Sequence, residues 1–211
     1  MQTFIAMSID YELMLFLNTD AFPFLDKIMW YVSEKWTWIP VYALLLFLLY
    51  KKFPGKYFFW IVVFIALCIT LNDQTASGLF KNWVGRLRPS HDPTIKDLLH
   101  YSLEPNGNLY KGGKFGFYSS HAANYAGVVT LFLLWLKPKK KWAIGLLLFW
   151  PLLIGYSRIY LGVHFPTDVL MGWMMGFLIG YLCYRLWWWL MKKLYPNDSS
   201  LLMRAPSSAM S

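Results

Sequence analysis

The chain has 211 residues, a length typical of a single domain, and it is 57% hydrophobic and 20% aromatic, with 12 Trp. Soluble domains are less apolar, so this composition indicates an integral membrane protein. The net charge of +9 suits an anionic membrane surface or a phosphorylated substrate, whereas the apolar composition argues against a nucleic-acid partner.

Residues 9–33 mix apolar side chains with five charged ones, Asp10, Glu12, Asp20, Asp26 and Lys27. A charge at the middle of a bilayer costs roughly 2.5–3.5 kcal/mol on insertion scales, which disfavours a simple span. We therefore expect residues 1–34 to form amphipathic helices that lie in the membrane interface. A sixth transmembrane span in this stretch is the alternative.

Five further apolar segments are expected to cross the membrane, because a helical span needs about 20 mainly apolar residues. They cover residues 35–50, 57–80, 119–136, 142–156 and 166–190. The predicted fold class is therefore all-α, a polytopic transmembrane helical bundle of about five spans over residues 35–193. Residues 194–211 are predicted to form a disordered tail.

Three lysine clusters orient these predicted spans. They lie at residues 51–56, 137–141 and 192–193, and five spans place all three on one side of the membrane. The positive-inside rule makes that side cytoplasmic. Residues 81–118 and 158–164 then face the other side, which is the periplasmic side of a bacterial inner membrane.

The first polar cluster on that face is KNWVGRLRP, residues 81–89. Lys81 and Arg88 are seven residues apart, about two helical turns, so both side chains can point the same way. The alternative is a basic helix end whose side chains reach the lipid headgroups.

The second cluster is YSSHAANYAG, residues 118–127, where a polar loop leads into an apolar helix. Ser119 or Ser120 suits the N-cap of that helix. The free N–H groups and the helix dipole there favour an anion, and His121 lies in the same first turn. The alternative is an ordinary N-cap followed by a surface histidine.

The third cluster is YSRIYLGVHFPTD, residues 156–168. Pro166 suits the first turn of the last helix, which places Asp168 in that turn, four residues from His164. An aspartate bonded to one imidazole nitrogen fixes the tautomer and leaves the other nitrogen as a base or nucleophile. A helix cap beside a chance histidine is the alternative.

The predicted topology brings the three clusters to one membrane face. Several cations, a helix N-terminus and two histidines, one with an aspartate partner, suit phosphoryl transfer without a metal. The loops of this face lack a tight His, Cys and carboxylate cluster, and their cations would repel a divalent ion. We therefore expect no metal and no cofactor.

These residues resemble the type 2 phosphatidic acid phosphatase superfamily of membrane lipid phosphatases. Lys81, Arg88 and Pro89 match its first motif, Lys, six residues, Arg-Pro. Ser119 and His121 match its second motif, Pro-Ser-Gly-His, in which Tyr118 and Ser120 replace Pro and Gly. The third motif is Ser-Arg, five residues, His, three residues, Asp, and it matches fully at Ser157, Arg158, His164 and Asp168. The likeness covers about residues 35–190.

The resemblance implies a role for each matched residue. His164 attacks phosphorus and becomes a phosphohistidine, Asp168 orients it, and His121 protonates the leaving oxygen before activating water. The phosphate is bound by five residues, Lys81, Arg88, Ser119, Ser120 and Arg158. The resemblance also implies a metal-independent reaction.

The expected activity is hydrolysis of a phosphate or pyrophosphate on a membrane lipid. The candidate substrates are undecaprenyl pyrophosphate, phosphatidylglycerophosphate and the phosphates of lipid A, and residues 90–118 are expected to select the headgroup. Two alternatives remain open: a phosphotransferase with an acceptor other than water, and a non-catalytic protein that binds or moves anionic lipids. The sequence does not indicate an oligomeric state.

Overall fold

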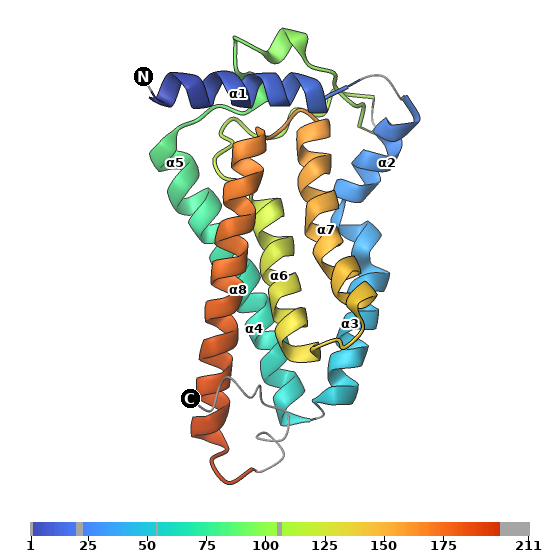
Figure 1. Cartoon of the computed structure of the whole chain (residues 1–211), viewed down its shortest axis with the longest axis vertical. Helices are drawn as coiled ribbons and strands as arrows, with labels where there is room; N and C mark the ends of the chain where they lie inside the picture. Colours follow the sequence, from blue (N-terminus) through green and yellow to red (C-terminus); the bar gives the residue numbers. More distant parts are fainter. Residues whose placement is uncertain (1, 20–22, 54, 105–106, 199–211) are drawn as a thin grey trace.

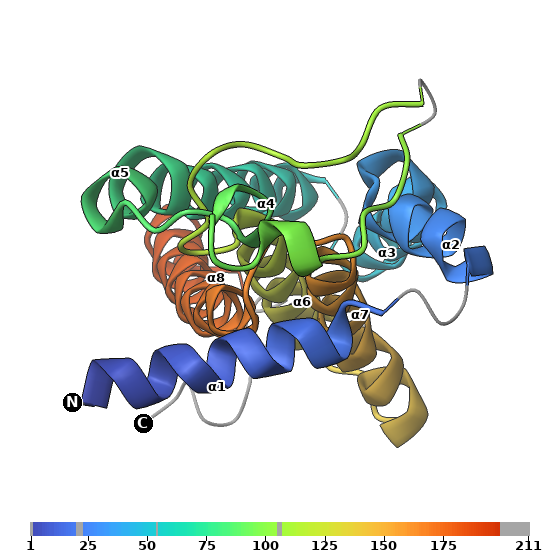
Figure 2. The ribbon, with the colours of Figure 1, turned by 90° about the horizontal axis from the view of Figure 1, so that it is seen from above.

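The computed structural model describes residues 2–19, 23–53, 55–104 and 107–198. These residues form a bundle of long helices, with one helix lying across its end (Figures 1 and 2). The helices of the bundle and its end are α1 (Gln2–Leu17), α2 (Pro23–Ser33), α3 (Ile39–Lys52), α4 (Lys56–Asp73), α5 (Lys81–Val84), α6 (Ser120–Leu136), α7 (Lys141–Tyr160) and α8 (Pro166–Leu194). Short turns η1 (Lys35–Trp38), η3 (Pro89–His91) and η4 (Lys96–Leu98) and the π-helical η2 (Gln74–Phe80) complete the order.

Helix α6 lies at the centre of the bundle, with α4, α7 and α8 around it (Figure 2). Its contact with α8 is close because α8 has glycine at every fourth position, Gly172, Gly176 and Gly180. A Cβ atom at Gly176 would lie 2.2 Å from the carbonyl oxygen of Ala123, and one at Gly180 would lie 2.6 Å from that of Gly127. The two backbones therefore touch, as small-residue stripes allow in membrane helices.

The all-α polytopic membrane bundle predicted from the sequence is confirmed, but the number of about five spans is only approximate. Within the described part of the chain, three helices are long and apolar enough to span a membrane: Lys56–Val84, Lys141–Tyr160 and Pro166–Leu194. A fourth span arises only if Phe24–Ser33 and Lys35–Lys52, which meet at a 72° bend, count as one. The predicted third span, α6, is a shorter apolar helix.

The predicted first span differs most from the structure. Residues 35–38 form the turn η1, so α3 alone is only 14 residues long. The segment reaches spanning length together with α2, which the sequence analysis placed in the interface. The interfacial placement of residues 1–34 stays a prediction, as does the disordered tail, of which residues 199–211 lie outside the described part.

The three lysine clusters gather at one end of the bundle, as expected (Figure 1). The ammonium of Lys52 donates to the carbonyl of Leu136 at 2.8 Å, which joins the α3–α4 turn to the α6–α7 turn. Lys56 pairs with Asp198 at 3.0 Å beyond the end of α8. The opposite end carries α1, the loop between α5 and α6, and the α7–α8 turn (Figure 1). All three polar clusters lie at that end.

Candidate active site

His164 lies in the turn between α7 and α8, where Gly162 adopts a positive φ of 73°. The imidazole is 1% exposed, and its Nδ1 lies 3.5 Å from Oδ2 of Asp168. Asp168 follows Pro166 in the first turn of α8, and its Oδ2 accepts a hydrogen bond from the backbone N–H of Phe165 at 3.0 Å. This bond holds the carboxylate beside Nδ1, which has no hydrogen bond among the described residues; an aspartate bonded to Nδ1 would leave Nε2 available to react.

The surroundings of His164 favour its neutral form. Burial lowers the pKa of His164 well below its usual range, and the positive charges of Arg88, Arg158 and Lys81 lower it further. A neutral imidazole keeps the lone pair that a nucleophile needs. The positive charges of all three cations therefore act on the same histidine.

Arg88 reaches the site from the loop after α5, where Leu87 forms an isolated bridge with Phe115. Its backbone N–H donates to the carbonyl of Lys114 at 3.0 Å, and its Nε donates to that of Phe115 at 3.1 Å. Burial, and then the charge of Arg158, lower the pKa of the Arg88 guanidinium to about 10. Arg88 therefore stays positively charged at neutral pH.

Arg158 lies in the last turn of α7 and is 2% exposed. Its terminal nitrogens donate to the hydroxyls of Ser33 and Tyr110, the latter at 2.8 Å. Its buried Nε has no hydrogen-bond partner among the described residues. A buried N–H without a partner is costly, so this group is suited to an anionic oxygen.

The N-terminus of α6 brings Ser119, Ser120 and His121 to the same end of the bundle. Ser119 is the N-cap: its hydroxyl accepts from the backbone N–H of Ala122 at 3.4 Å, which confirms one of the two predicted caps. The N–H of Ser119 donates to the carbonyl of Asp168 at 3.0 Å and ties α6 to α8. The first turn of α6 can therefore present N–H groups to an anion.

Lys81 and Tyr118 both contact the π-helical segment η2. The ammonium of Lys81 lies 3.2 Å from the hydroxyl of Ser77, and the hydroxyl of Tyr118 lies 2.7 Å from that of Thr75. Tyr118, which stands where the family motif has proline, is fully buried. Segments of π-helix occur frequently at functional sites, where they alter side-chain direction.

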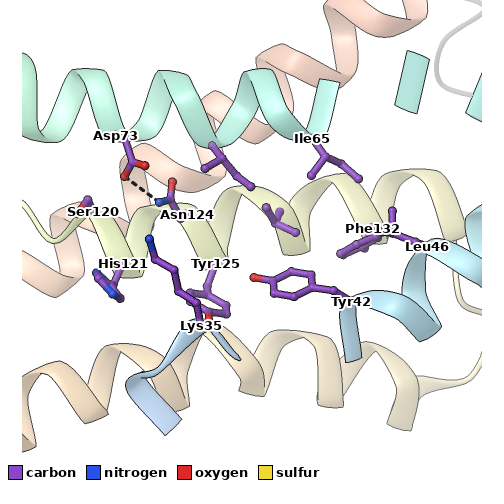
Figure 3. Close-up of a pocket in the computed structure, with 12 residues that line it drawn as sticks. Lys35, Tyr42, Leu46, Ile65, Asp73, Ser120, His121, Asn124, Tyr125 and Phe132 are labelled. Atoms are coloured by element: carbon purple, nitrogen blue, oxygen red, sulfur yellow. Dashed lines mark hydrogen bonds between the residues drawn. The ribbon is translucent and has the colours of Figure 1, made fainter. Parts of the chain in front are cut away.

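A cavity of about 370 Å³ opens beside His121, between α3, α4 and α6 (Figure 3). Its polar end is formed by Lys35, Asp73, Ser120, His121 and Asn124, of which Asp73 accepts a hydrogen bond from Asn124 at 2.9 Å. The rest is lined by apolar and aromatic side chains: Tyr42, Leu46, Ile65, Ile69, Tyr125, Val128 and Phe132. A pocket with one polar end and apolar walls suits an amphiphilic ligand.

Three charged residues at this end were not predicted as part of the site. Arg86 donates to Oδ1 of Asp168 at 3.0 Å and to Oδ2 of Asp10 at 2.5 Å. Asp10 was expected among interfacial charges, yet it is only 2% exposed. Lys35 lines the cavity beside His121 (Figure 3). Only Arg86 carried a sequence signal, as a further cation within KNWVGRLRP.

The site can therefore hold an anion next to a neutral histidine. Two buried arginines and the first turn of α6 supply donors, and the carboxylate of Asp168 lies 3.5 Å from Nδ1 of His164. Among the residues that the structure describes, no group of three or more His, Cys, Asp or Glu could hold a metal ion.

Comparisons with known proteins identify the fold and its relatives. The family model of the PAP2 superfamily matches residues 58–192, which contain all three polar clusters. The lipid A 4′-phosphatase of Bacteroides thetaiotaomicron is 40% identical over 83% of this chain and 76% of that protein. The lipid A 4′-phosphatase of Porphyromonas gingivalis is 36% identical over 86% of this chain and 74% of that protein.

A similar fold occurs among solved structures. The PAP2-type phosphatidylglycerolphosphate phosphatase of Bacillus subtilis matches with a TM-score of 0.61 at 23% identity, over 86% of each chain. A further relative was found by its sequence rather than by a solved structure: the undecaprenyl-diphosphatase of Sulfolobus acidocaldarius is 33% identical over 81% of this chain and 75% of that protein. The relatives thus bear the names of phosphatases with different lipid substrates.

Proposed function

The chain belongs to the PAP2 superfamily, and from that membership we propose that it hydrolyses the 4′-phosphate of lipid A through a phosphohistidine intermediate. The observation that carries the reaction is the buried His164, held by Asp168 and surrounded by Arg88 and Arg158. The two lipid A 4′-phosphatases at 40% and 36% identity support the choice of substrate.

In the first step, Nε2 of His164 forms a bond to phosphorus while the bond from phosphorus to the ester oxygen breaks. His121 donates a proton to the leaving oxygen, which departs as the lipid alcohol. Asp168 accepts the Nδ1–H of His164 and offsets the positive charge that develops on the imidazole. In the second step, His121 takes a proton from water, whose oxygen attacks phosphorus and releases phosphate from His164.

The cations and amides of the site stabilise the transferring phosphoryl group. Arg88, Arg158 and Lys81 carry the positive charge that the equatorial oxygens need, and Ser119 and Ser120 at the start of α6 add further donors. The unpaired Nε–H of Arg158 gains an acceptor when phosphate binds. The donors are held by the fold before substrate arrives, which reduces the cost of reorganisation.

The cavity beside His121 is the place for the lipid part of the substrate. Its polar end lies next to the group that protonates the leaving oxygen, and its walls are apolar. A volume of about 370 Å³ is within the range of ligand pockets and holds one portion of a large lipid. The remaining hydrocarbon then stays in the bilayer.

The test is phosphate release by the detergent-purified protein in EDTA from three substrates: lipid A, undecaprenyl pyrophosphate and phosphatidylglycerophosphate. We expect the fastest release from lipid A, with mass spectrometry placing the loss at the 4′ position. A faster release from undecaprenyl pyrophosphate would favour a diphosphatase instead, which the relative at 33% identity makes the second candidate. No release from any of the three would favour a binding or transport role.

Two further measurements address the intermediate and the acceptor. An acid-labile phosphoryl label on the wild-type protein, absent from His164→Asn, is expected for a phosphohistidine. Turnover in ¹⁸O-labelled water should yield labelled inorganic phosphate. Unlabelled phosphate transferred to a lipid or sugar would identify a phosphotransferase.

The assignment of the lipid cavity has its own test. Val128→Trp should fill the cavity and lower turnover of the lipid, because Val128 lies in its apolar wall. Turnover of p-nitrophenyl phosphate, which has no lipid part, should fall much less. An equal loss for both substrates would contradict the assignment.

We also propose that the site faces the periplasmic side of the inner membrane. The lysine clusters at the opposite end of the bundle support this orientation through the positive-inside rule. A cysteine introduced in the 137–141 loop should resist a membrane-impermeant thiol reagent in intact cells with a permeabilised outer membrane, and labelling there would reverse the orientation.

A further inference from the structure

Asp168 is fully buried, which makes its charge expensive unless a cation or several donors contact it. One carboxylate oxygen, Oδ2, accepts from the N–H of Phe165 and lies 3.5 Å from Nδ1 of His164. The other oxygen, Oδ1, accepts from Arg86 at 3.0 Å. Arg86 is thus the cation in direct contact with the carboxylate that faces His164.

Arg86 is itself held from several directions. The nitrogen that contacts Asp168 also donates to the hydroxyl of Thr167 at 2.7 Å. Its other terminal nitrogen pairs with Asp10 at 2.5 Å, and the guanidinium carbon lies 4.0 Å from the centre of the Phe165 ring. These contacts fix both the position and the plane of the guanidinium.

Asp10 comes from α1, the helix that lies across the end of the bundle (Figure 2). Its Oδ1 accepts from the backbone N–H of Thr167 at 3.0 Å, and its Oδ2 accepts from the Thr167 hydroxyl at 2.5 Å. Asp10 therefore binds the residue next to Asp168 and also the arginine that contacts Asp168. A surface helix attached only by apolar packing would not need a buried carboxylate here.

We propose that Arg86 is a positioning residue, which fixes the Asp168 carboxylate against His164, and that Asp10 of α1 keeps Arg86 in place. Helix α1 then forms part of the catalytic end of the enzyme. This inference rests on the proposed function, because it assigns Asp168 to the orientation of His164. It adds two residues that the three motifs do not specify: Arg86 stands at one of the six open positions of the first motif, and Asp10 lies outside all three.

The test compares four variants in detergent: Arg86→Met, Arg86→Lys, Asp10→Asn and Glu12→Gln. Glu12 is an exposed acidic residue of the same helix and serves as the matched control. With p-nitrophenyl phosphate, Arg86→Met should lower kcat on the order of 10–100-fold, as loss of an outer partner does, with KM changed less than about twofold. Arg86→Lys should keep a kcat between those of Arg86→Met and the wild type. The kcat of Asp10→Asn should fall less than that of Arg86→Met, and the kcat of Glu12→Gln should equal that of the wild type.

A second readout needs no turnover. In protein labelled with ¹⁵N-histidine, the signals of His164 are those absent from His164→Asn, and their shifts report which ring nitrogen carries the proton. We expect the Nδ1–H tautomer in the wild type and a mixture of tautomers in Arg86→Met, with an unchanged circular dichroism spectrum.

The outcomes separate the two proposals. If the His164 chemical shifts of Arg86→Met are the same as those of the wild type, the positioning role is overturned, whether or not the wild type turns over any substrate. Wild-type protein that releases no phosphate, but whose His164 tautomer depends on Arg86, would overturn the proposed function alone. Equal losses in Arg86→Met and Arg86→Lys, matched by equal loss of thermal stability, would assign Arg86 to folding instead.

Discussion

The two ends of the bundle both carry positive charge, but they hold it in different ways. At the lysine end, ammonium groups lie near aromatic rings at the surface: Lys56 is 4.0 Å from the Tyr195 ring centre, and Lys193 is 5.2 Å from that of Trp189. At the opposite end, Arg88 and Arg158 are 9% and 2% exposed and bond to fixed carbonyl and hydroxyl oxygens.

This difference teaches what each end requires of its cations. An exposed contact between a cation and an aromatic ring contributes about 0.5–1 kcal/mol to stability. Near anionic headgroups, another basic side chain can replace the lysine. Buried arginines bind through a planar set of donors and cannot be exchanged freely. Single substitutions should therefore change little at the lysine end and much at the arginine end.

The largest effect should come from the histidine that the arginines surround. His164→Asn removes the nitrogen that we propose attacks phosphorus while keeping a polar side chain of similar size. We expect phosphate release to fall at least about 10⁴-fold, because loss of a nucleophile can cost about 10⁶-fold. A rate within tenfold of wild type, measured with the best lipid substrate, would show that another residue attacks phosphorus.

A direct comparison of the two ends uses Arg88→Ala and Lys140→Ala. Arg88 is expected to contact the phosphate, so its loss should lower kcat/KM by about 10²–10³-fold. Lys140 is exposed and lies 5.9 Å from the Trp142 ring centre, so its loss should stay within about twofold. Comparable losses in both variants would remove the distinction between the ends.

The loop that supports the arginine end can be tested through two glycines. A Cβ at Gly116 would lie 2.8 Å from Oδ2 of Asp168 and 3.3 Å from Cγ of Arg88, whereas a Cβ at Gly113 would meet no atom within 4 Å. Gly116→Ala should cost about 1–3 kcal/mol of stability and reduce activity about tenfold, because it displaces two site residues. Gly113→Ala should match wild type in both thermal unfolding and phosphate release.

The smallest effect is a shift in pH dependence. The charge of Arg88 lowers the pKa of His164, so removing it in Arg88→Gln should raise that pKa. Protonated His164 cannot attack, so the acid limb of kcat/KM should move to higher pH. The acid limb of kcat/KM in Lys140→Gln should stay at the wild-type pH. If the acid limb of Arg88→Gln moves to lower pH instead, Arg88 does not lower the pKa of His164.

Much of the site could be predicted because its residues lie in short local patterns. The step from Pro166 to Asp168 is set by the first turn of a helix, and Ser119 precedes a long apolar run as an N-cap does. The lysine clusters predicted which loops share an end of the bundle. These features need only helix geometry and charge, which are local properties of the sequence.

The remaining residues depend on contacts that no local pattern specifies. Asp10 meets Arg86 and Thr167 across 76 and 157 residues of chain, and only the placement of α1 brings them together. Lys35 lies directly after the 72° bend between Ser33 and Lys35, and it lines the cavity; apolar composition does not predict this bend. The same bend explains why the predicted first span, residues 35–50, differs from the structure, in which spanning length is reached only together with α2.

The glycines of α8 bear on how such an enzyme can change during evolution. They lock α8 against α6, and these two helices carry Asp168, Ser119 and His121. The far wall of the cavity beside His121, which we propose holds part of the lipid, comes instead from α3 and α4, through residues such as Leu46 and Ile69. Mutations in that wall can thus alter which lipid is accepted while the reacting groups keep their spacing. Divergence of substrate need not disturb the chemistry.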